Sequence, residues 1–470
     1  MDTIIISPEL PPNDVLLLRN LAEDIKQYQE NRSGPSNKDA VSTPGQEAVD
    51  GALGHGAPSS RDEHDLARMR ALNDPAHKEF EPTIFSSVDF RDLSSRLHPV
   101  VYQYILKPYI KWAQGIARHP RCVVIVCDVI MVTHLIIYFT TSVPSAIWLF
   151  YHFTYLHGII HAAMQFYYVG TYTLMMHQHI HAGGVLRKQS WVHLFDITFP
   201  YITDPLMGHT FNSYYYHHVK HRSVFQVILE VPSYHVEGNG PDDLSSTVRY
   251  QRDNIWHFLH YVGRFYFLVW LDLPLYFLRK DRPTFALKAA FWELFSYSML
   301  LTLFRLNSRP AFFVFLLPFL LLRLGLMVGN WGQHALVDAD EPDSDYRSSI
   351  TLIDVPSNRY CFNDGYHTSH HLNPLRHWRE HPVHFLANKQ TYSAEHALVF
   401  HNIDYLEITL RLLLHDYEHL ARCMVPIGEK QIAMSIEQRA ALLKRCTRRF
   451  TEEEIKEKFG APVKLASKTK

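Results

Sequence analysis

The stretch FFVFLLPFLLLRLGLMVGNWGQH, residues 312–334, joins a long apolar run to two polar side chains at its end. Arg323 is the only Lys, Arg, Asp or Glu within it. About 20 mostly apolar residues suffice for a helix to cross a bilayer. Asn330 and His334 are four residues apart, and that spacing places both side chains on one face of a helix. The stretch therefore predicts a membrane-spanning helix that ends in two possible metal ligands.

Four further apolar runs are candidate spans. The link SVPS, residues 142–145, suits a tight hairpin between the first two of them. The run 256–278 is interrupted by Trp, Tyr, His, Arg and Asp, so we expect it to lie in the membrane interface as an amphipathic helix. We therefore expect an all-α membrane protein with four spans in two helical hairpins. The alternative is a soluble protein with thick buried helices, which a carbonate wash would release from membranes. The four runs are 122–141, 146–176, 256–278 and 284–304.

Charge predicts the orientation of these spans. Four basic residues precede the first span, and the hairpin tip carries no charge. By the positive-inside rule, the N-terminus and the residues after 176 are cytosolic, and so is the C-terminus. We expect a partly disordered cytosolic extension over 1–97, a membrane domain over 98–400 and a helical cytosolic tail over 401–470. Within the extension, residues 31–80 are rich in Ser, Gly and Pro and are expected to be a mobile linker. The basic residues are Lys107, Lys111, Arg118 and Arg121.

Composition excludes several classes of protein. The chain has 470 residues, and its 46 Lys and Arg nearly balance its 47 Asp and Glu, so no nucleic-acid partner is expected. Its 5 cysteines form no Cys-x-x-Cys pair, which argues against a zinc ribbon and a disulfide scaffold. The start MDTIIISPELPPND lacks the basic and apolar regions of a secretory signal. Histidine is the unusual residue, with 31 copies.

The histidines gather in four clusters. Spacings of three and four residues aim several side chains at one point on a helix. A lone histidine on an apolar face is more often a core residue than a ligand, but four clusters with such spacing on one predicted side of the membrane indicate a metal site. Imidazole suits Zn, Cu, Fe and Ni, and the donors are more than one ion can hold. We therefore expect two ions, and a pair of irons with open positions would suit activation of dioxygen. The clusters are HQHIH with His177 and His181; HHVKH with His217, His218 and His221; NWGQH with Asn330 and His334; and HTSHH with His367, His370 and His371.

These motifs, ordered around two membrane hairpins, resemble the integral-membrane fatty acid desaturase/hydroxylase superfamily over roughly residues 120–385. The cluster within NDGYHTSHHLNP, residues 363–374, carries the most specific part of the resemblance. The resemblance implies a catalytic domain over 98–400 whose histidine boxes sit in a cytosolic helical cap. It implies two non-haem irons, dioxygen as co-substrate, and oxidation of an unactivated C–H pair in a lipid or acyl chain. Carried onto this sequence, the ligands are His177, His181, His218, His221, His334, His367, His370 and His371, with Asn330 a weak or water-mediated ligand.

The second box departs from the family pattern. A His-x-x-His-His box should follow His217, but Arg222 stands where its last histidine belongs. Removal of residues 222–234, RSVFQVILEVPSY, would give HHVKHHVEGNGPDD, in which His235 completes the box. Three explanations remain open: a translated intron, a genuine loop that returns His235 to the metal, or replacement of the missing ligand by His217.

Other expectations concern partners, orienting groups and the reaction. No His-Pro-Gly-Gly haem motif occurs, so the resemblance implies a separate electron donor, of the haem-carrier or ferredoxin type. It also implies the endoplasmic reticulum. Metal-bound histidines usually donate their other N–H to a fixed acceptor. Asp364 is our first candidate for this role, with Asp204 and His217 next. The expected activity is desaturation of a fatty acyl lipid or acyl-CoA. The alternatives are a hydroxylase or ketolase of a lipid or other apolar metabolite, a non-catalytic metal-binding protein, or an inactive relative broken at the second box.

Overall fold

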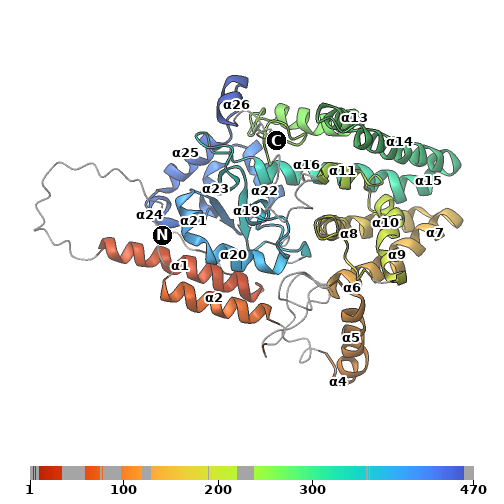
Figure 1. The fold of residues 1–470 in the computed structure, drawn as a ribbon, viewed down its shortest axis with the longest axis horizontal. Helices are drawn as coiled ribbons and strands as arrows, with labels where there is room; N and C mark the ends of the chain where they lie inside the picture. The colour runs from red at the N-terminus through yellow and green to blue at the C-terminus, as the bar shows by residue number, and fades with distance from the viewer. Residues whose placement is uncertain are drawn as a thin grey trace, which may run out of the picture.

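The computed structural model describes residues 4, 6, 10–33, 59–74, 77, 97–118, 129–188, 190–219, 238–355, 358 and 360–459. Most of the long helices extend to one side of the molecule, and the two-stranded sheet lies on the other side among mostly short helices (Figure 1). The chain is mostly helical, as the sequence predicts. The long helices are α8 Tyr155–Ala182, α13 Ile255–Arg279, α14 Pro283–Leu306 and α16 Leu317–His334, together with the run formed by α6 Val129–Ile137, π-helical η2 Tyr138–Ser142 and α7 Val143–Tyr151.

Two helical runs among the described residues are long and apolar enough to cross a membrane. The first is Val129–Tyr151, with 23 residues, and the second is Ser308–His334, with 27 residues. The second comprises α15 Ser308–Ala311, π-helical η3 Phe312–Leu316 and α16, so the span predicted from the opening stretch forms a helix of the expected kind.

The first hairpin is not where the sequence predicts it. Residues 142–145 continue a helix, and the chain turns only at His152–Thr154. Proline lacks an N–H and crowds the carbonyl four residues earlier, which usually ends a helix. Here Pro144 follows the wider π-helical turn of η2, in which Val143 N–H bonds to Tyr138 O, and the helix continues.

The same arrangement, a π-helical segment before a proline, occurs at two further positions. Pro108 follows η1 Tyr102–Leu106 at the start of α5 Lys107–Ile116, and Pro318 follows η3 at the start of α16. In each case the first residue after the π-helical segment donates its N–H to the first residue of that segment. A local widening therefore lets each proline sit inside an unbroken run of helix.

The run 256–278 forms α13, which packs on α14 through a short turn at Lys280–Arg282. Leu273 and Phe277 of α13 are buried against Ala286 and Ala289 of α14. The remaining elements between the long helices are α4 Pro99–Val101, α9 Ser190–Thr198, α10 Pro200–Leu206 and α11 Ser213–Val219.

The protein is not purely α-helical. Strands β1 Ile350–Ile353 and β2 Leu398–His401 pair in parallel, with Ile350 opposite Leu398. All four residues of each strand are buried, so neither shows the alternation of exposed and buried residues that reveals a strand in sequence. The expected domain boundary at residue 400 falls within β2. Short helices surround this sheet: α17 Asp345–Ser348, α19 His367–Leu372, η4 Trp378–Glu380, α20 His381–Ala387, α21 Lys389–Ala394, α22 Tyr405–Leu413, α23 Tyr417–Cys423, α24 Gly428–Ile432, α25 Ile436–Cys446 and α26 Glu452–Lys458.

The N-terminal helices pack along this part of the molecule (Figure 1). Helix α1 comprises Pro12–Ser33. Helix α2, Ser60–Asn73, lies inside the stretch expected to be a mobile linker, so that expectation is wrong for these residues. A capping box between Ser59 and Asp62 begins α2, and Leu66, Met69 and Leu72 of this helix are buried. The Lys389 ammonium group binds Asp24 and Asp62 at 2.6 and 2.7 Å, which fastens both helices to α21.

Candidate metal centre

The C-terminal end of α8 supplies the first pair of histidines. His177 and His181 lie one helical turn apart and are half-buried, with ring centroids 4.6 Å apart. His370 of α19 completes a group of three, which we call the outer cluster, and its Nε2 lies 2.9 Å from His177 Nε2. Gly183 ends α8 in the left-handed conformation, with φ of 67°, so the chain turns away directly after the histidines.

A second group of three histidines, which we call the inner cluster, is fully buried. It comprises His334 at the end of α16, and His367 and His371 of α19. His367 Nε2 lies 3.1 Å from His334 Nε2 and 3.1 Å from His371 Nε2. In each cluster one nitrogen from every histidine lies within 4.8 Å of the others.

One short helix contributes to both clusters. In α19, His367 and His371 are four residues apart and face the inner cluster, whereas His370 faces the outer cluster. The loop before α19 is fixed against β1, because Leu352 N–H bonds to Gly365 O at 2.7 Å. Gly365 is required there, since a Cβ would lie 2.3 Å from Asn358 Oδ1. The strand thus sets the position of the third box.

The inner cluster fits a cation. His334 Nδ1 lies 2.8 Å from Ser348 O, and His371 Nδ1 lies 3.3 Å from an Asp345 carboxylate oxygen. Both acceptors require an N–H on Nδ1, so in the neutral rings Nε2 carries a lone pair. His367 Nε2 carries at most one proton, which can bond to the Nε2 of His334 or of His371 but not to both. A bound cation would instead accept a lone pair from all three Nε2 atoms.

The spacing of these nitrogens also suits a metal. Two imidazole nitrogens bound at about 2.0–2.1 Å to one ion lie roughly 2.8–3.4 Å apart for angles between square and tetrahedral. The nearest contacts here are 2.9 Å in the outer cluster and 3.1 Å in the inner cluster. Burial and the neighbouring histidines lower the pKa of His367 well below its usual value, which keeps the ring neutral. Neutral imidazole is the form that binds a metal.

Most of the second box lies beyond what the structure describes. His221 and His235 fall outside the described residues, as does the side chain of His218. His217 lies at the end of α11, where its Nε2 is 3.2 Å from Ser245 Oγ and its ring packs against Phe265. His217 is a member of neither cluster.

Asn330, one helical turn before His334, is held through its amide nitrogen. Its Nδ2 donates to Ser245 O at 2.9 Å and to Tyr261 Oη at 2.7 Å. These bonds hold the end of α16 against α13 and the loop that follows residue 238. The described contacts of Asn330 are thus structural.

The groups that orient the histidines differ from those expected. Asp364 accepts from Gln333 at 3.2 Å, and burial raises its pKa to about 7. Asp204 accepts from Tyr172 at 2.6 Å. Neither carboxylate pairs with a histidine of the clusters in the described structure. The observed orienting groups are Asp345, the Ser348 carbonyl and the Tyr214 hydroxyl, which lies 3.3 Å from His177 Nδ1.

Sequence position gave little indication of these groups. Asp345 precedes His367 by 22 residues and belongs to none of the boxes. The Ser348 group is a backbone carbonyl, which any residue type could supply. Only Tyr214, three residues before His217, lies beside a recognised motif.

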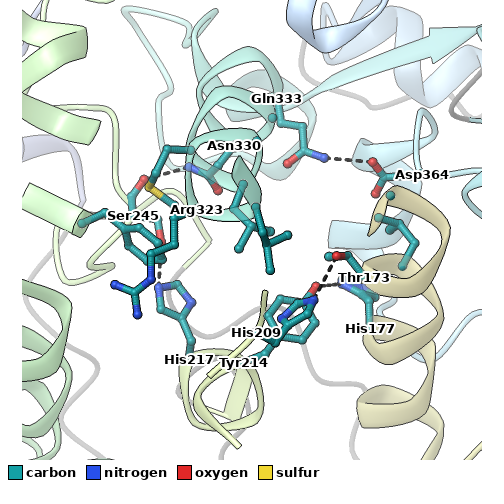
Figure 2. A pocket seen from close by; sticks show the side chains of 18 of the residues that line it. Thr173, His177, His209, Tyr214, His217, Ser245, Arg323, Asn330, Gln333 and Asp364 are labelled. Atoms are coloured by element: carbon teal, nitrogen blue, oxygen red, sulfur yellow. Dashed lines mark hydrogen bonds between the residues drawn. The ribbon is translucent and has the colours of Figure 1, made fainter. Parts of the chain in front are cut away.

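A cavity of about 390 Å³ opens beside both clusters. Most of its lining is apolar and comes from α8, α13 and α16. His177 and Thr173 lie on one side of it, and His217, Ser245 and Arg323 on the other (Figure 2). The lining includes four histidines of the clusters, His334, His367, His370 and His371, in addition to His177. The paired histidine clusters therefore face a space suited to an apolar ligand.

The fold joins two helical runs long enough to cross a membrane to two three-histidine clusters that lie beside an apolar cavity. A model of the fatty acid desaturase family matches residues 146–402, which is more than half of the chain, and the protein belongs to that family. Membership implies a lipid substrate and association with a membrane. Comparisons with curated proteins and with solved structures gave no match.

Proposed function

We propose that the chain is a membrane-bound di-iron oxidoreductase that desaturates a fatty acyl chain with dioxygen and electrons from a separate protein. The observation that carries this proposal is the pair of three-histidine clusters at one end of an apolar cavity. His177, His181 and His370 would hold one iron, and His334, His367 and His371 the other. When bound, the irons would supply dioxygen activation and the removal of hydrogen from an unactivated C–H pair.

The protein's own residues position and isolate the reaction. The Ser348 carbonyl and Asp345 fix two imidazole rings of the inner cluster, and Tyr214 contacts the His177 ring of the outer cluster. Apolar residues such as Val169, Leu326 and Met327 line the cavity, where they would exclude water and hold an extended acyl chain beside the histidines.

Each cluster offers three nitrogens, and we assign the remaining ligands to the second box. His218, His221 and His235 are the candidates. Helix α11 leads toward the cavity, because Tyr214 and His217 both line it.

For the membrane arrangement we propose four spans: Val129–Tyr151, most of α8, α14 and Ser308–His334. The histidines of α8 and α16 lie at the ends of two of these helices, and both ends meet α19. A common side for all histidines is consistent with an even number of spans and cytosolic termini. We propose the endoplasmic reticulum as the location.

Metal content tests the function. Purified, iron-reconstituted protein should contain two irons per chain, and oxidation of a bound acyl substrate should require them. One iron or none would reject the two-centre site. A parallel measurement on a deletion of residues 222–234 would show whether that stretch interferes: iron only in the deletion would identify the chain as written as inactive. Product analysis would separate desaturation from hydroxylation.

A further inference from the structure

A buried ion pair lines the cavity about three helical turns along α16 from His334. Arg323 of α16 and Glu293 of α14 are 3.2 Å apart, with side chains 6% and 0% exposed. Both residues line the cavity. Arg323 precedes His334 by 11 residues, which is about 16 Å along an α-helix. Ionisable residues at such a depth in a membrane helix are costly and usually have a function.

Glu293 has no free acceptor oxygen. Its Oε1 accepts from Thr210 Oγ1 at 2.7 Å, and its Oε2 accepts from Tyr297 Oη at 2.5 Å as well as from Arg323. The carboxylate is therefore held by three donors from different parts of the fold. Its effect is to fix and neutralise the Arg323 guanidinium.

Arg323 itself is only partly satisfied. One terminal nitrogen donates to Glu293 and to Tyr297 Oη, the latter at 3.0 Å. The other terminal nitrogen is buried and has no hydrogen-bond partner among the described residues. The guanidinium carbon lies 4.4 Å from the centre of the Phe319 ring, which supports the cation but supplies no acceptor. A buried donor without an acceptor is costly, and a purely structural ion pair would leave that cost uncompensated.

We propose that Arg323 binds a neutral oxygen acceptor, a hydroxyl or a carbonyl, carried by the substrate about 16 Å from the histidine clusters. A carboxylate is excluded because Glu293 already balances the guanidinium charge, and a second buried anion would be left unpaired. The preferred substrate is thus a long apolar chain with an additional oxygen function toward one end, rather than a plain acyl chain. This inference rests on the proposed function in one respect: the cavity is the place where the substrate binds.

Ligand selectivity tests the proposal. The full-length protein in nanodiscs, without added iron, would be titrated with hexadecanoic acid, ω-hydroxyhexadecanoic acid and hexadecanedioic acid in competition with labelled hexadecanoic acid. We expect the ω-hydroxy acid to bind about tenfold tighter than hexadecanoic acid, as for a hydrogen bond to a charged group. The dicarboxylic acid should show no such gain. Equal binding of all three, or tightest binding of the dicarboxylic acid, would overturn the proposal.

Two variants assign the preference to this group. Arg323→Met should abolish the preference for the ω-hydroxy acid while hexadecanoic acid still binds, whereas exposed Arg305→Met on α14 should leave the preference intact. Glu293→Gln removes the balancing anion, so the dicarboxylic acid should become the tightest ligand. Unchanged selectivity in Glu293→Gln would contradict the proposal even if Arg323→Met failed to fold.

The selectivity test and the test of the proposed function can fail independently of each other. Binding of these probes does not require iron, so a chain that binds no metal could still show the preference. Conversely, two irons per chain with no preference among the probes would leave the oxidoreductase proposal intact and reject the polar subsite.

Discussion

The two histidine clusters are alike in composition but differ in how firmly they are held. All three members of the inner cluster are buried, and two of their Nδ1 atoms face fixed acceptors, the Ser348 carbonyl and Asp345. Two members of the outer cluster are only half-buried, and the contact to His177 comes from a rotatable Tyr214 hydroxyl. Preorganised ligands bind a metal more tightly, so the inner position should hold its ion longer. The more open outer position is the one nearer to solvent.

Removal of one ligand from each cluster gives the largest expected effect. His371→Ala should remove the inner ion, and His181→Ala the outer ion, each leaving about one metal per chain. Activity should fall by more than about a hundredfold in both, because each ion is needed. Elemental analysis of purified protein, with circular dichroism to confirm folding, makes the measurement. Loss of neither ion in either variant would show that these clusters are not the metal site.

The second-largest effect should come from the Asp345 carboxylate, which orients His371 in the inner cluster. Asp345→Asn removes the charge that faces His371 Nδ1, and we expect metal affinity at the inner site to fall by about 10–100-fold. Competition with a chelator measures that affinity. Asp343→Asn, two residues away and without a described histidine contact, is the matched control. An equal loss in both variants would indicate a general effect of surface charge.

The corresponding change at the outer cluster should be milder. Tyr214→Phe removes one hydroxyl from His177, and a neutral hydrogen bond contributes only about 0.5–1.5 kcal/mol. We expect the outer ion to dissociate severalfold faster, with the inner ion unchanged. Stopped-flow transfer of metal to a chelator would resolve the two ions. Faster loss of the inner ion would mean that the Tyr214 hydroxyl supports the inner cluster rather than the outer one.

The smallest effect on metal binding should come from the residue that precedes His367 in the chain. The Tyr366 hydroxyl donates to buried Asp14 of α1, directly beside His367. Tyr366→Phe should lower the free energy of unfolding by about 1–3 kcal/mol, because the Asp14 carboxylate loses a buried donor. Metal affinity should change less than in Asp345→Asn. Denaturant unfolding followed by fluorescence would give the first quantity.

The sequence identified the histidines of the two candidate clusters better than it identified their grouping. The i, i+4 spacing of His177 with His181, and of His367 with His371, predicted pairs that the structure brings together. That His370 joins the first pair, and His334 the second, depends on tertiary packing of α19 against α8 and α16. Sequence spacing contains no information on that packing.

The remaining differences have similarly local causes. Pro144 indicated a turn, but a π-helical turn before it lets the helix continue, and no residue pattern marks such a turn. The four-residue strands β1 and β2 are too short and too uniformly buried to show a period of two. Asp345 was missed because its role depends on α17 and α19 meeting in space rather than on proximity along the chain.

The shared helix α19 has a consequence for how the protein acquires its metals. Its six residues carry ligands to both clusters, so the first ion to bind restricts the motion of a segment that the second ion also needs. The entropic cost of ordering that segment is then largely met before the second ion arrives, which makes loading cooperative. Iron titrations should therefore show that occupancy of one cluster raises the affinity of the other.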